Sequence, residues 1–279
     1  MIDAELEGKI VLITGANHGI GAATAIAFAK QKAKIFATYL RINNNERNDT
    51  PDYKNNQAKD ANEVIGQIRS LDGVVKSLEA DLSDVSKIPL LFDTAEKTVG
   101  PIDVLVNNAA YCVPDTFEFN KNTVEESTGM LSSIFSSSSH DEHFAINSRA
   151  VALMMKEFAT RCVKRNASWG RIINISTDAA DCFPTEISYG ASKAALESFS
   201  RSAAVELGKY GITVNIVAPG PIQTGWMTKE VEELQAKRSP LKRIGRPNDV
   251  ADVIVFLASN QARWITGQKL YVGGGNRVT

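Results

Sequence analysis

Short apolar runs rich in valine and isoleucine alternate along the chain with longer segments in which alanine and other small residues dominate. Such runs are typical of strands buried on both faces of a parallel sheet, and the longer segments are typical of helices. The runs predict strands at residues 9–13, 33–39, 74–79, 103–106, 171–175, 213–218 and 269–272. The longer segments predict helices at residues 20–32, 143–165, 188–207 and 250–258. This alternation predicts an α/β fold with a doubly wound parallel sheet in three α/β/α layers.

Two polar stretches interrupt the alternation. Residues 41–60 are rich in asparagine, and residues 127–139 contain the serine run 136–139. Neither stretch has enough apolar residues to form core, so we expect both to be surface loops, with a lid or a rim of a binding site as the alternative. No Pro-, Gly- or Ser-rich linker divides the chain, and residues 1–279 are therefore expected to form a single domain.

Charge and composition narrow the class of partner. The 31 basic and 32 acidic side chains give a net charge of −1, so no general positive field favours nucleic acid or an anionic membrane. No apolar run reaches the roughly 18 residues of a membrane helix, and the acidic start lacks the features of a signal peptide. We expect a cytoplasmic protein with a small-molecule partner. Cys112, Cys162 and Cys182 form no Cys-x-x-Cys pair and are expected to be reduced packing residues.

A glycine-rich turn follows the first predicted strand and precedes a helix. It runs from Thr14 to Gly21, with glycines at positions 15, 19 and 21. Glycines at such a turn let the backbone approach a pyrophosphate, and the helix N-terminus offers free N–H groups to it. No Gly-Lys-Ser/Thr follows, which excludes a P-loop. The turn predicts a dinucleotide site of the Rossmann type.

A phenol and an ammonium stand four residues apart at the start of a long predicted helix. Tyr189 and Lys193 therefore share a helix face. A nearby cation favours the phenolate, so the pair could act as a tuned acid and base. The alternative is an ordinary surface pair at helical spacing. The sequence at 140–143, His-Asp-Glu-His, lacks the order His-Glu-x-x-His, and we predict no metal site.

Taken together, these motifs resemble the short-chain dehydrogenase/reductase family along nearly the whole chain, and within it the 3-oxoacyl-[acyl-carrier-protein] reductase-like members. Residues 14–21 resemble its Thr-Gly-x-x-x-Gly-x-Gly motif, residues 107–110 its Asn-Asn-Ala-Gly motif with alanine at the last position, and residues 189–193 its Tyr-x-x-x-Lys motif. The resemblance implies an NAD(P)-dependent oxidoreductase that transfers a hydride between nicotinamide and a carbonyl or secondary alcohol. The alternative is a non-catalytic cofactor-binding sensor or scaffold of the same fold.

The resemblance also implies residue roles. Tyr189 would exchange the proton at the substrate oxygen, and Lys193 would hold the nicotinamide ribose and lower the pKa of Tyr189. Asn147 matches an asparagine that keeps a water in the proton relay. The hydroxyl that polarises the carbonyl is Ser176 or Thr177, and strand alternation favours Thr177. The substrate pocket is expected to be lined by residues 110–114, 179–184 and 225–237.

The cofactor is expected to be held by residues of several motifs: Gly15, Asn17, His18, Gly19, Ile20, Gly21, Arg41, Asp81, Leu82, Asn108, Ala109, Ala110, Tyr189, Lys193, Pro219, Gly220, Ile222 and Thr224. No carboxylate ends the second strand, whereas Arg41 and a partly protonated His18 suit a 2′-phosphate. The sequence therefore predicts NADP(H) over NAD(H), with Glu46 folding back onto the ribose as the alternative.

The two longest predicted helices suggest an oligomer. Their small residues permit close helix approach: Ala191, Ala194, Ala195, Ser198 and Ser202. Together with the family resemblance, these small residues predict a homo-oligomer, namely a tetramer. The alternative is that these residues pack on the chain's own sheet.

Overall fold

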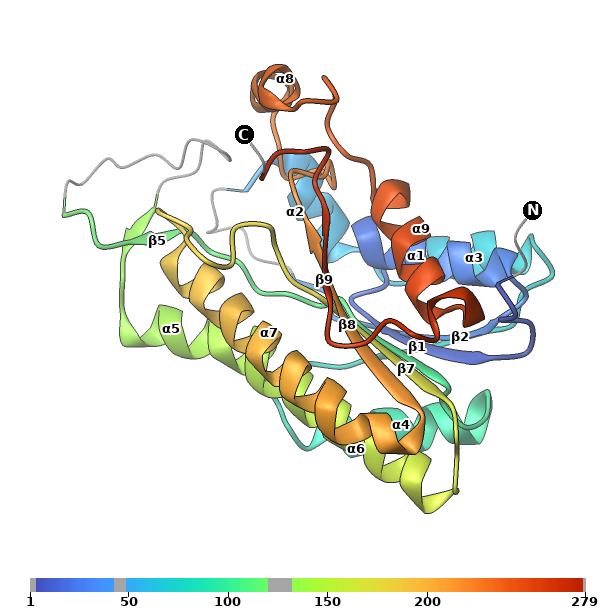
Figure 1. The fold of residues 1–279 in the computed structure, drawn as a ribbon. Coiled ribbons are helices and arrows are strands. Elements are labelled where there is room, and N and C mark those ends of the chain that lie inside the picture. The colour runs from blue at the N-terminus through green and yellow to red at the C-terminus, as the bar shows by residue number, and fades with distance from the viewer. Residues whose placement is uncertain (1–3, 43–48, 120–131, 278–279) are drawn as a thin grey trace.

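The computed structural model describes residues 4–42, 49–119 and 132–277. Its central sheet has seven parallel strands in the order β3-β2-β1-β4-β7-β8-β9 (Figure 1). These strands are β1 (Ile10–Thr14), β2 (Lys34–Tyr39), β3 (Val75–Glu79), β4 (Val104–Asn107), β7 (Gly170–Ile175), β8 (Ile212–Pro219) and β9 (Lys269–Val272). The short strands β5 (Asp115–Thr116) and β6 (Ser133–Ile134) pair separately. The predicted doubly wound sheet is confirmed.

Helices cover both faces of the sheet (Figure 1). One layer holds α1 (Gly19–Lys30), α3 (Asn62–Arg69) and α9 (Pro247–Ala258), and the other holds α4 (Lys87–Thr98), α6 (Val151–Lys164) and α7 (Ile187–Leu207). Strand β1 explains why: Val11 and Ile13 belong to the first apolar cluster, whereas Ile10 and Leu12 belong to the second. Strand β1 is thus apolar on both faces, which produces its continuous apolar run in the sequence.

The remaining helical segments lie at the edges of these layers. They are α2 (Pro51–Ala58), α5 (Ser137–Phe144), the π-helical turn η1 (Ala145–Ala150), η2 (Gly208–Tyr210), α8 (Lys229–Arg238) and η3 (Asn260–Ala262). Among the described residues, no helix combines the length and apolar character needed to cross a membrane.

The serine run begins a helix, so the loop expected at 127–139 is wrong for residues 137–139, and residues 133–134 form the short strand β6. Ser136 accepts a hydrogen bond from the backbone N–H of Ser139, which is an N-cap for α5. The helix predicted at 143–165 is consequently longer and consists of α5, η1 and α6. Residues 127–131 of that expected loop lie outside the described residues.

The asparagine-rich stretch also contains a helix, so the loop expected at 41–60 is wrong for residues 51–58. Thr50 caps α2 by accepting a hydrogen bond from the N–H of Tyr53, and Pro51 occupies its first turn. Only Gln57 of this helix is buried. Because α2 has almost no apolar face, periodicity alone does not reveal it.

The chain reverses direction across the sheet between β1 and β4. From β1 it runs outward to β2 and β3, and then returns to β4 on the other side. The carboxyl ends of strands separate at such a switch point, and ligands of doubly wound sheets bind there. A cavity of about 1040 Å³ lies at this edge.

Candidate active site

The cavity brings together most of the residues that the sequence singled out for the cofactor. Those that line it are Gly15, Asn17, His18, Gly19, Ile20, Asp81, Leu82, Asn108, Ala109, Ala110, Tyr189, Lys193, Pro219, Gly220, Ile222 and Thr224. Ser176 and Thr177 line it as well, whereas Gly21, Arg41 and Asn147 do not. These segments follow the carboxyl ends of β1, β3, β4, β7 and β8, so the sheet topology gathers them.

The glycine turn is closed tightly on itself. A Cβ on Gly21 would lie 2.1 Å from the carbonyl oxygen of Gly15, and one on Gly15 would lie 2.9 Å from the Cα of Ala109. Gly15 and Gly19 also have positive φ angles of 64° and 56°. Only glycine satisfies these contacts and this backbone.

The asparagine motif pins the end of β4 to this turn. The side-chain amide of Asn108 donates to the carbonyl oxygens of Thr14 and Gly15, each at 2.9 Å. The hydroxyl of Thr14 accepts from the backbone N–H groups of Asn108 and Ala109, also at 2.9 Å. Two motifs separated by more than ninety residues therefore form one rigid wall of the cavity.

Two cavity-lining polar atoms next to the turn are buried without a hydrogen-bond partner among the described residues. They are Nδ1 of His18 and the hydroxyl of Thr38, which lies near the end of β2. Buried polar atoms are normally paired, so both are available to a ligand. Together with the glycine cradle, they fit the phosphate and ribose groups of a dinucleotide.

The partial protonation expected of His18 is wrong, and Arg41, the other group expected at a 2′-phosphate, contacts a carboxylate in this structure. Burial, helped by the positive charge of Lys59, lowers the pKa of His18 to about 4, so this imidazole is neutral rather than partly protonated near pH 7. Arg41 lies outside the cavity lining, and its guanidinium is 2.7 Å from a carboxylate oxygen of Glu79. Arg41 and Glu79 sit next to each other because β2 and β3 pair in parallel.

Helix α7 carries the Tyr189/Lys193 pair into the cavity. Lys193 is only 1% exposed, and its ammonium donates to the carbonyl oxygen of Ile175 at 2.8 Å. Burial lowers the pKa of Lys193 to about 8, against the nearby Cys112 and Glu197, which raise it. A cation held by one carbonyl is thus close to losing its proton.

The pKa of Tyr189 is raised, not lowered as expected. Burial raises it well above 10, and Cys112 and Glu186 add to the effect. The Lys193 ammonium lies 5.7 Å from the centroid of the Tyr189 ring. Tyr189 is therefore a neutral phenol at physiological pH.

The two candidate hydroxyls differ in what they contact. Ser176 donates to a carboxylate oxygen of Glu197 at 2.7 Å, and the ammonium of Lys269 binds the same oxygen at 2.8 Å. Thr177 accepts from the N–H of Ala179 at 3.3 Å, which leaves its own hydroxyl proton for a ligand. The geometry favours Thr177 over Ser176 as the group that faces the substrate.

Asn147 lies outside the cavity lining and connects two of its neighbours, Tyr111 and Ser192, by hydrogen bonds. Its side-chain oxygen accepts from the N–H of Tyr111 at 2.8 Å, and its amide donates to the Tyr111 carbonyl at 2.7 Å and to Ser192 at 3.0 Å. It is fully buried in the π-helical turn, a distortion that is frequent at functional sites. Its side chain thus fixes the backbone that leads from β4 into the cavity.

Three aromatic side chains belong to the part of the cavity lining that was expected to meet the substrate. They are Tyr111, Phe183 and Trp226, one from each of the three segments expected to form the substrate pocket. Cys112 and the buried Glu186 line the cavity as well, with the thiol donating to the carboxylate at 3.2 Å. The expected segments include Trp226 but not Glu186, whose place follows only from the fold.

The remaining candidates from the sequence are a histidine and cysteines that lie outside the proposed reactive groups. His143 is fully buried, with Nδ1 donating to the Ser139 carbonyl at 2.6 Å and Nε2 accepting from the N–H of Val113 at 3.1 Å. Within residues 4–42, 49–119 and 132–277, no three His, Cys, Asp or Glu side chains cluster as metal ligands. Cys182 is exposed, so its expected packing role is wrong, whereas Cys162 is buried.

Known proteins resemble this chain over nearly its full length. The family model described as enoyl-(acyl carrier protein) reductase matches residues 15–277. The chain is 35% identical over 271 residues to the uncharacterized oxidoreductase YjdA of Bacillus subtilis (strain 168), and the match covers 96% of each protein. It is 34% identical over 276 residues to NADPH-dependent aldehyde reductase 2, chloroplastic, of Arabidopsis thaliana, covering 97% of this chain and 94% of that protein.

One solved structure extends this likeness to a ketone reductase. The promiscuous reductase LugOII catalyses keto-reduction at C1 during lugdunomycin biosynthesis. It is 31% identical to this chain, with a TM-score of 0.77 over 98% of this chain and 99% of that one. With the glycine turn, the asparagine motif and the Tyr189/Lys193 pair gathered in one cavity, these matches identify the chain as a member of the short-chain dehydrogenase/reductase family and an NAD(P)-dependent oxidoreductase.

Proposed function

We propose that this chain is an NADP(H)-dependent carbonyl reductase in which Tyr189 gives the proton to the substrate oxygen. The observation that carries the proposal is the neutral phenol of Tyr189 at the cavity wall beside the buried Lys193. A phenol that holds its proton at neutral pH favours reduction, because a carbonyl oxygen must gain a proton as it becomes an alcohol.

Neighbouring residues support the same reaction. The bound dinucleotide supplies the hydride from its nicotinamide ring. Thr177 donates a hydrogen bond to the carbonyl oxygen and so polarises it. With a pKa of about 8, Lys193 is mainly charged at pH 7, and its charge stabilises the phenolate left when Tyr189 gives up its proton. The Lys193 ammonium also holds the ribose hydroxyls.

The cavity supports a substrate with an apolar or aromatic part beside the carbonyl. Tyr111, Phe183 and Trp226 offer ring faces there, and the indole N–H of Trp226 donates to the Ile222 carbonyl at 2.7 Å, which fixes the ring. Fixed aromatic walls favour flat or bulky substrates over short aliphatic ones. The keto-reduction described for LugOII is consistent with this class.

Two observations support NADP(H). Thr38, Tyr39 and Leu40 at the end of β2 line the cavity and include no carboxylate, and one relative is NADPH-dependent. Arg41 would contribute by exchanging Glu79 for the 2′-phosphate. Asp49, which also lines the cavity, is the carboxylate that would favour NAD(H). Glu46, the alternative from the sequence, lies outside the described residues.

Steady-state kinetics with both cofactors test this function. Aryl ketones, aliphatic ketones and aldehydes would be screened with NADPH and NADH, and nicotinamide fluorescence would measure binding separately. We expect turnover of aryl ketones with a higher kcat/KM for NADPH, and a smaller preference in R41A. A preference for NADH that is lost in D49N would overturn the cofactor assignment. Tight binding without turnover of any carbonyl would favour the non-catalytic sensor.

A second copy of the chain is the proposed partner of the outer face of α6 and α7. Between these helices lies a groove of about 560 Å³, lined by small residues such as Ala159 and Ala203 and by Val163 and Phe199. Phe199 is 47% exposed and Val163 is 41% exposed. Light scattering should give a mass above the 30.3 kDa of one chain, up to that of a tetramer. A 30.3 kDa particle at micromolar concentration would refute the oligomer.

A further inference from the structure

Helix α2 spans the mouth of the cofactor cavity, although its sequence is almost entirely polar. At its start, the hydroxyl of Thr50 donates to the carbonyl oxygen of Gly225. In its last turn, the side-chain amide of Asn56 donates to the carbonyl oxygen of Thr224 at 3.2 Å. Both acceptors belong to the loop that follows β8. The helix is thus fastened along one rim of the cavity.

A second rim of the cavity, at the glycine turn, is fastened to the other end of the same helix. The side-chain amide of Asn17, in the glycine turn, donates to the carbonyl oxygen of Lys59 at 2.9 Å. Lys59 is the residue that follows the last turn of α2. A single short helix therefore connects the glycine turn after β1 with the loop after β8.

The β8 loop meets α2 at Gly225, whose backbone conformation favours glycine. Gly225 has a φ of 99°, and a Cβ on it would lie 2.8 Å from the amide nitrogen of Asn56 and 3.5 Å from the backbone N of Tyr53. The two rims also meet directly, because a Cβ on Gly19 would lie 3.1 Å from a methyl group of Thr224. The three segments converge over one side of the cavity.

Two side chains of α2 face the cavity beneath this convergence. Tyr53 and the buried Gln57 both line it, and the Tyr53 ring stands edge-on to His18 with ring centroids 5.9 Å apart. His18 belongs to the glycine turn that fits the dinucleotide phosphates. A dinucleotide seated on that turn consequently lies under α2.

We propose that α2 is a clamp over the dinucleotide, which must detach from the 224–225 loop for the cofactor to enter or leave. Tyr53 and Gln57 are the clamp's contacts with the cofactor. The proposal rests on the dinucleotide site of the proposed function, but not on a preference between the two cofactors. Because the fastenings are ordinary hydrogen bonds, each contributes a several-fold factor to the rate of opening.

Stopped-flow fluorescence of NADPH and NADH on the full-length protein tests the clamp. In T50V, which removes one fastening together with the N-cap of α2, and in N56A, which removes one fastening alone, we expect the dissociation rate constant to rise about five-fold, and more in the double variant. Association should accelerate as well, because entry needs the same opening. The matched control is N55A, which removes an exposed asparagine of the same helix and should leave both rates unchanged.

Hydrogen exchange of the unaltered protein gives a second readout that does not depend on the variants folding. Bound cofactor should slow exchange of the backbone amides of residues 53–58, because a clamp held down by its ligand opens less often. Unchanged exchange there, or dissociation rates in folded T50V and N56A equal to those of N55A, would overturn the clamp alone. A wild-type protein that binds neither NADPH nor NADH would overturn the proposed function together with the clamp.

Discussion

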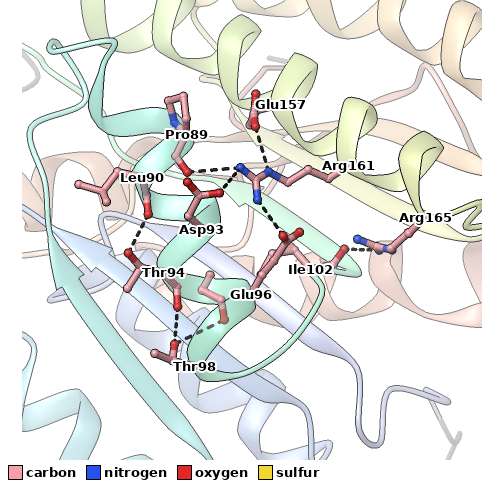
Figure 2. A network of polar contacts seen from close by, with 11 residues as sticks. Pro89, Leu90, Asp93, Thr94, Glu96, Thr98, Ile102, Glu157, Arg161 and Arg165 are labelled. Carbon is pink, nitrogen blue, oxygen red and sulfur yellow. Dashed lines mark hydrogen bonds and ion pairs between the residues drawn. The ribbon is translucent and has the colours of Figure 1, made fainter.

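Two cations on the same side of the sheet, the partly buried Arg161 and the fully buried Lys193, have opposite surroundings. Arg161 on α6 is surrounded by carboxylates, at 2.6 Å from Asp93, 2.7 Å from Glu96 and 2.9 Å from Glu157 (Figure 2). Lys193 on α7 is more deeply buried, and its ammonium donates to the carbonyl oxygen of Ile175. One cation joins two helices, and the other faces a cavity.

The surroundings drive the two pKa values apart. Burial by itself lowers the pKa of Arg161, but the hydrogen bonds that its guanidinium donates to Asp93, Glu96 and Glu157 raise it above its ordinary value. Burial likewise lowers the pKa of Lys193, and there the result is about 8. A cation whose burial is offset by neighbouring carboxylates, such as Arg161, keeps its charge at every accessible pH and stabilises the fold. A poorly compensated one is unstable in its charged form and therefore responsive to a ligand.

Tyr189→Phe, in the cavity that Lys193 faces, should produce the largest effect on turnover. The change removes the phenolic proton while the ring keeps its contacts, so kcat should fall on the order of 10³-fold. The dissociation constant of the nicotinamide cofactor should stay nearly the same, as fluorescence titration would measure. Turnover near the wild-type rate in Y189F would reject Tyr189 as the proton donor.

Lys193→Met should damage activity and raise stability at once. We expect kcat/KM to fall about 100-fold, because one ammonium serves both the ribose and the phenolate. At pH 7 the buried charge costs free energy, since its pKa is about 8 in the folded chain and 10.5 when unperturbed. Its removal should add up to about 3 kcal/mol to the free energy of unfolding, less about 1 kcal/mol for the Ile175 carbonyl left unpaired.

The pH dependence of this gain gives it a distinct signature. Between pH 8 and pH 10.5 the unfolded chain binds more protons at Lys193 than the folded chain, so wild-type stability rises with pH across that window. The advantage of K193M should therefore be largest below pH 8 and shrink above it. Denaturant titrations at pH 7 and pH 9.5 measure this difference. An equal gain at both values would mean that the charge is not its cause.

The sequence was sufficient to predict the sheet and the long helices because these elements bury apolar residues. Seven apolar runs correspond to the seven strands of the central sheet, with ends shifted by at most one residue. Helix α8, whose sequence is KEVEELQAKR, carries little apolar surface and leaves no such pattern. Helix α2 could have been found from a different signal, the Thr-Pro pair at 50–51, which is typical of a helix start.

The residues of the candidate site likewise divide into those that the sequence could predict and those that it could not. Gly15, Tyr189 and Lys193 could be predicted because dinucleotide and proton chemistry restrict residue type and spacing within one short motif. The partners of Arg41 and Ser176 could not, because Glu79 and Glu197 meet them through strand pairing and helix packing rather than through local sequence. Burial also reversed the expected direction of the Tyr189 pKa, and burial is a property of the folded chain.

Thr177→Val tests which of the two candidate hydroxyls, Thr177 or Ser176, polarises the substrate carbonyl. Loss of the hydrogen bond to the substrate carbonyl should lower kcat/KM about 10- to 100-fold, and T177S should restore most of it. Ser176→Ala, in contrast, should keep activity within a few-fold and cost about 1 kcal/mol of stability, because its partner is the buried Glu197. The opposite pattern, with S176A inactive and T177V active, would exchange the two assignments.

Arg161→Met should have the smallest effect on turnover and tests the compensated side of the comparison. The change leaves Glu96 and Glu157 facing each other between α4 and α6 without their shared cation (Figure 2). Removing one partner of a buried charge cluster is costly, but Asp93 is 66% exposed and its share is screened by solvent, so we expect a loss of about 2 kcal/mol. Denaturant titration would measure that loss, with K156M, which removes an exposed cation of the same helix, as the control.

Since the cluster lies away from the cavity, kcat and KM should match the wild type at temperatures where R161M is folded. A fall in kcat of the folded variant would show that the packing of α4 on α6 also positions the catalytic groups, and the contrast between the two cations would then be one of degree.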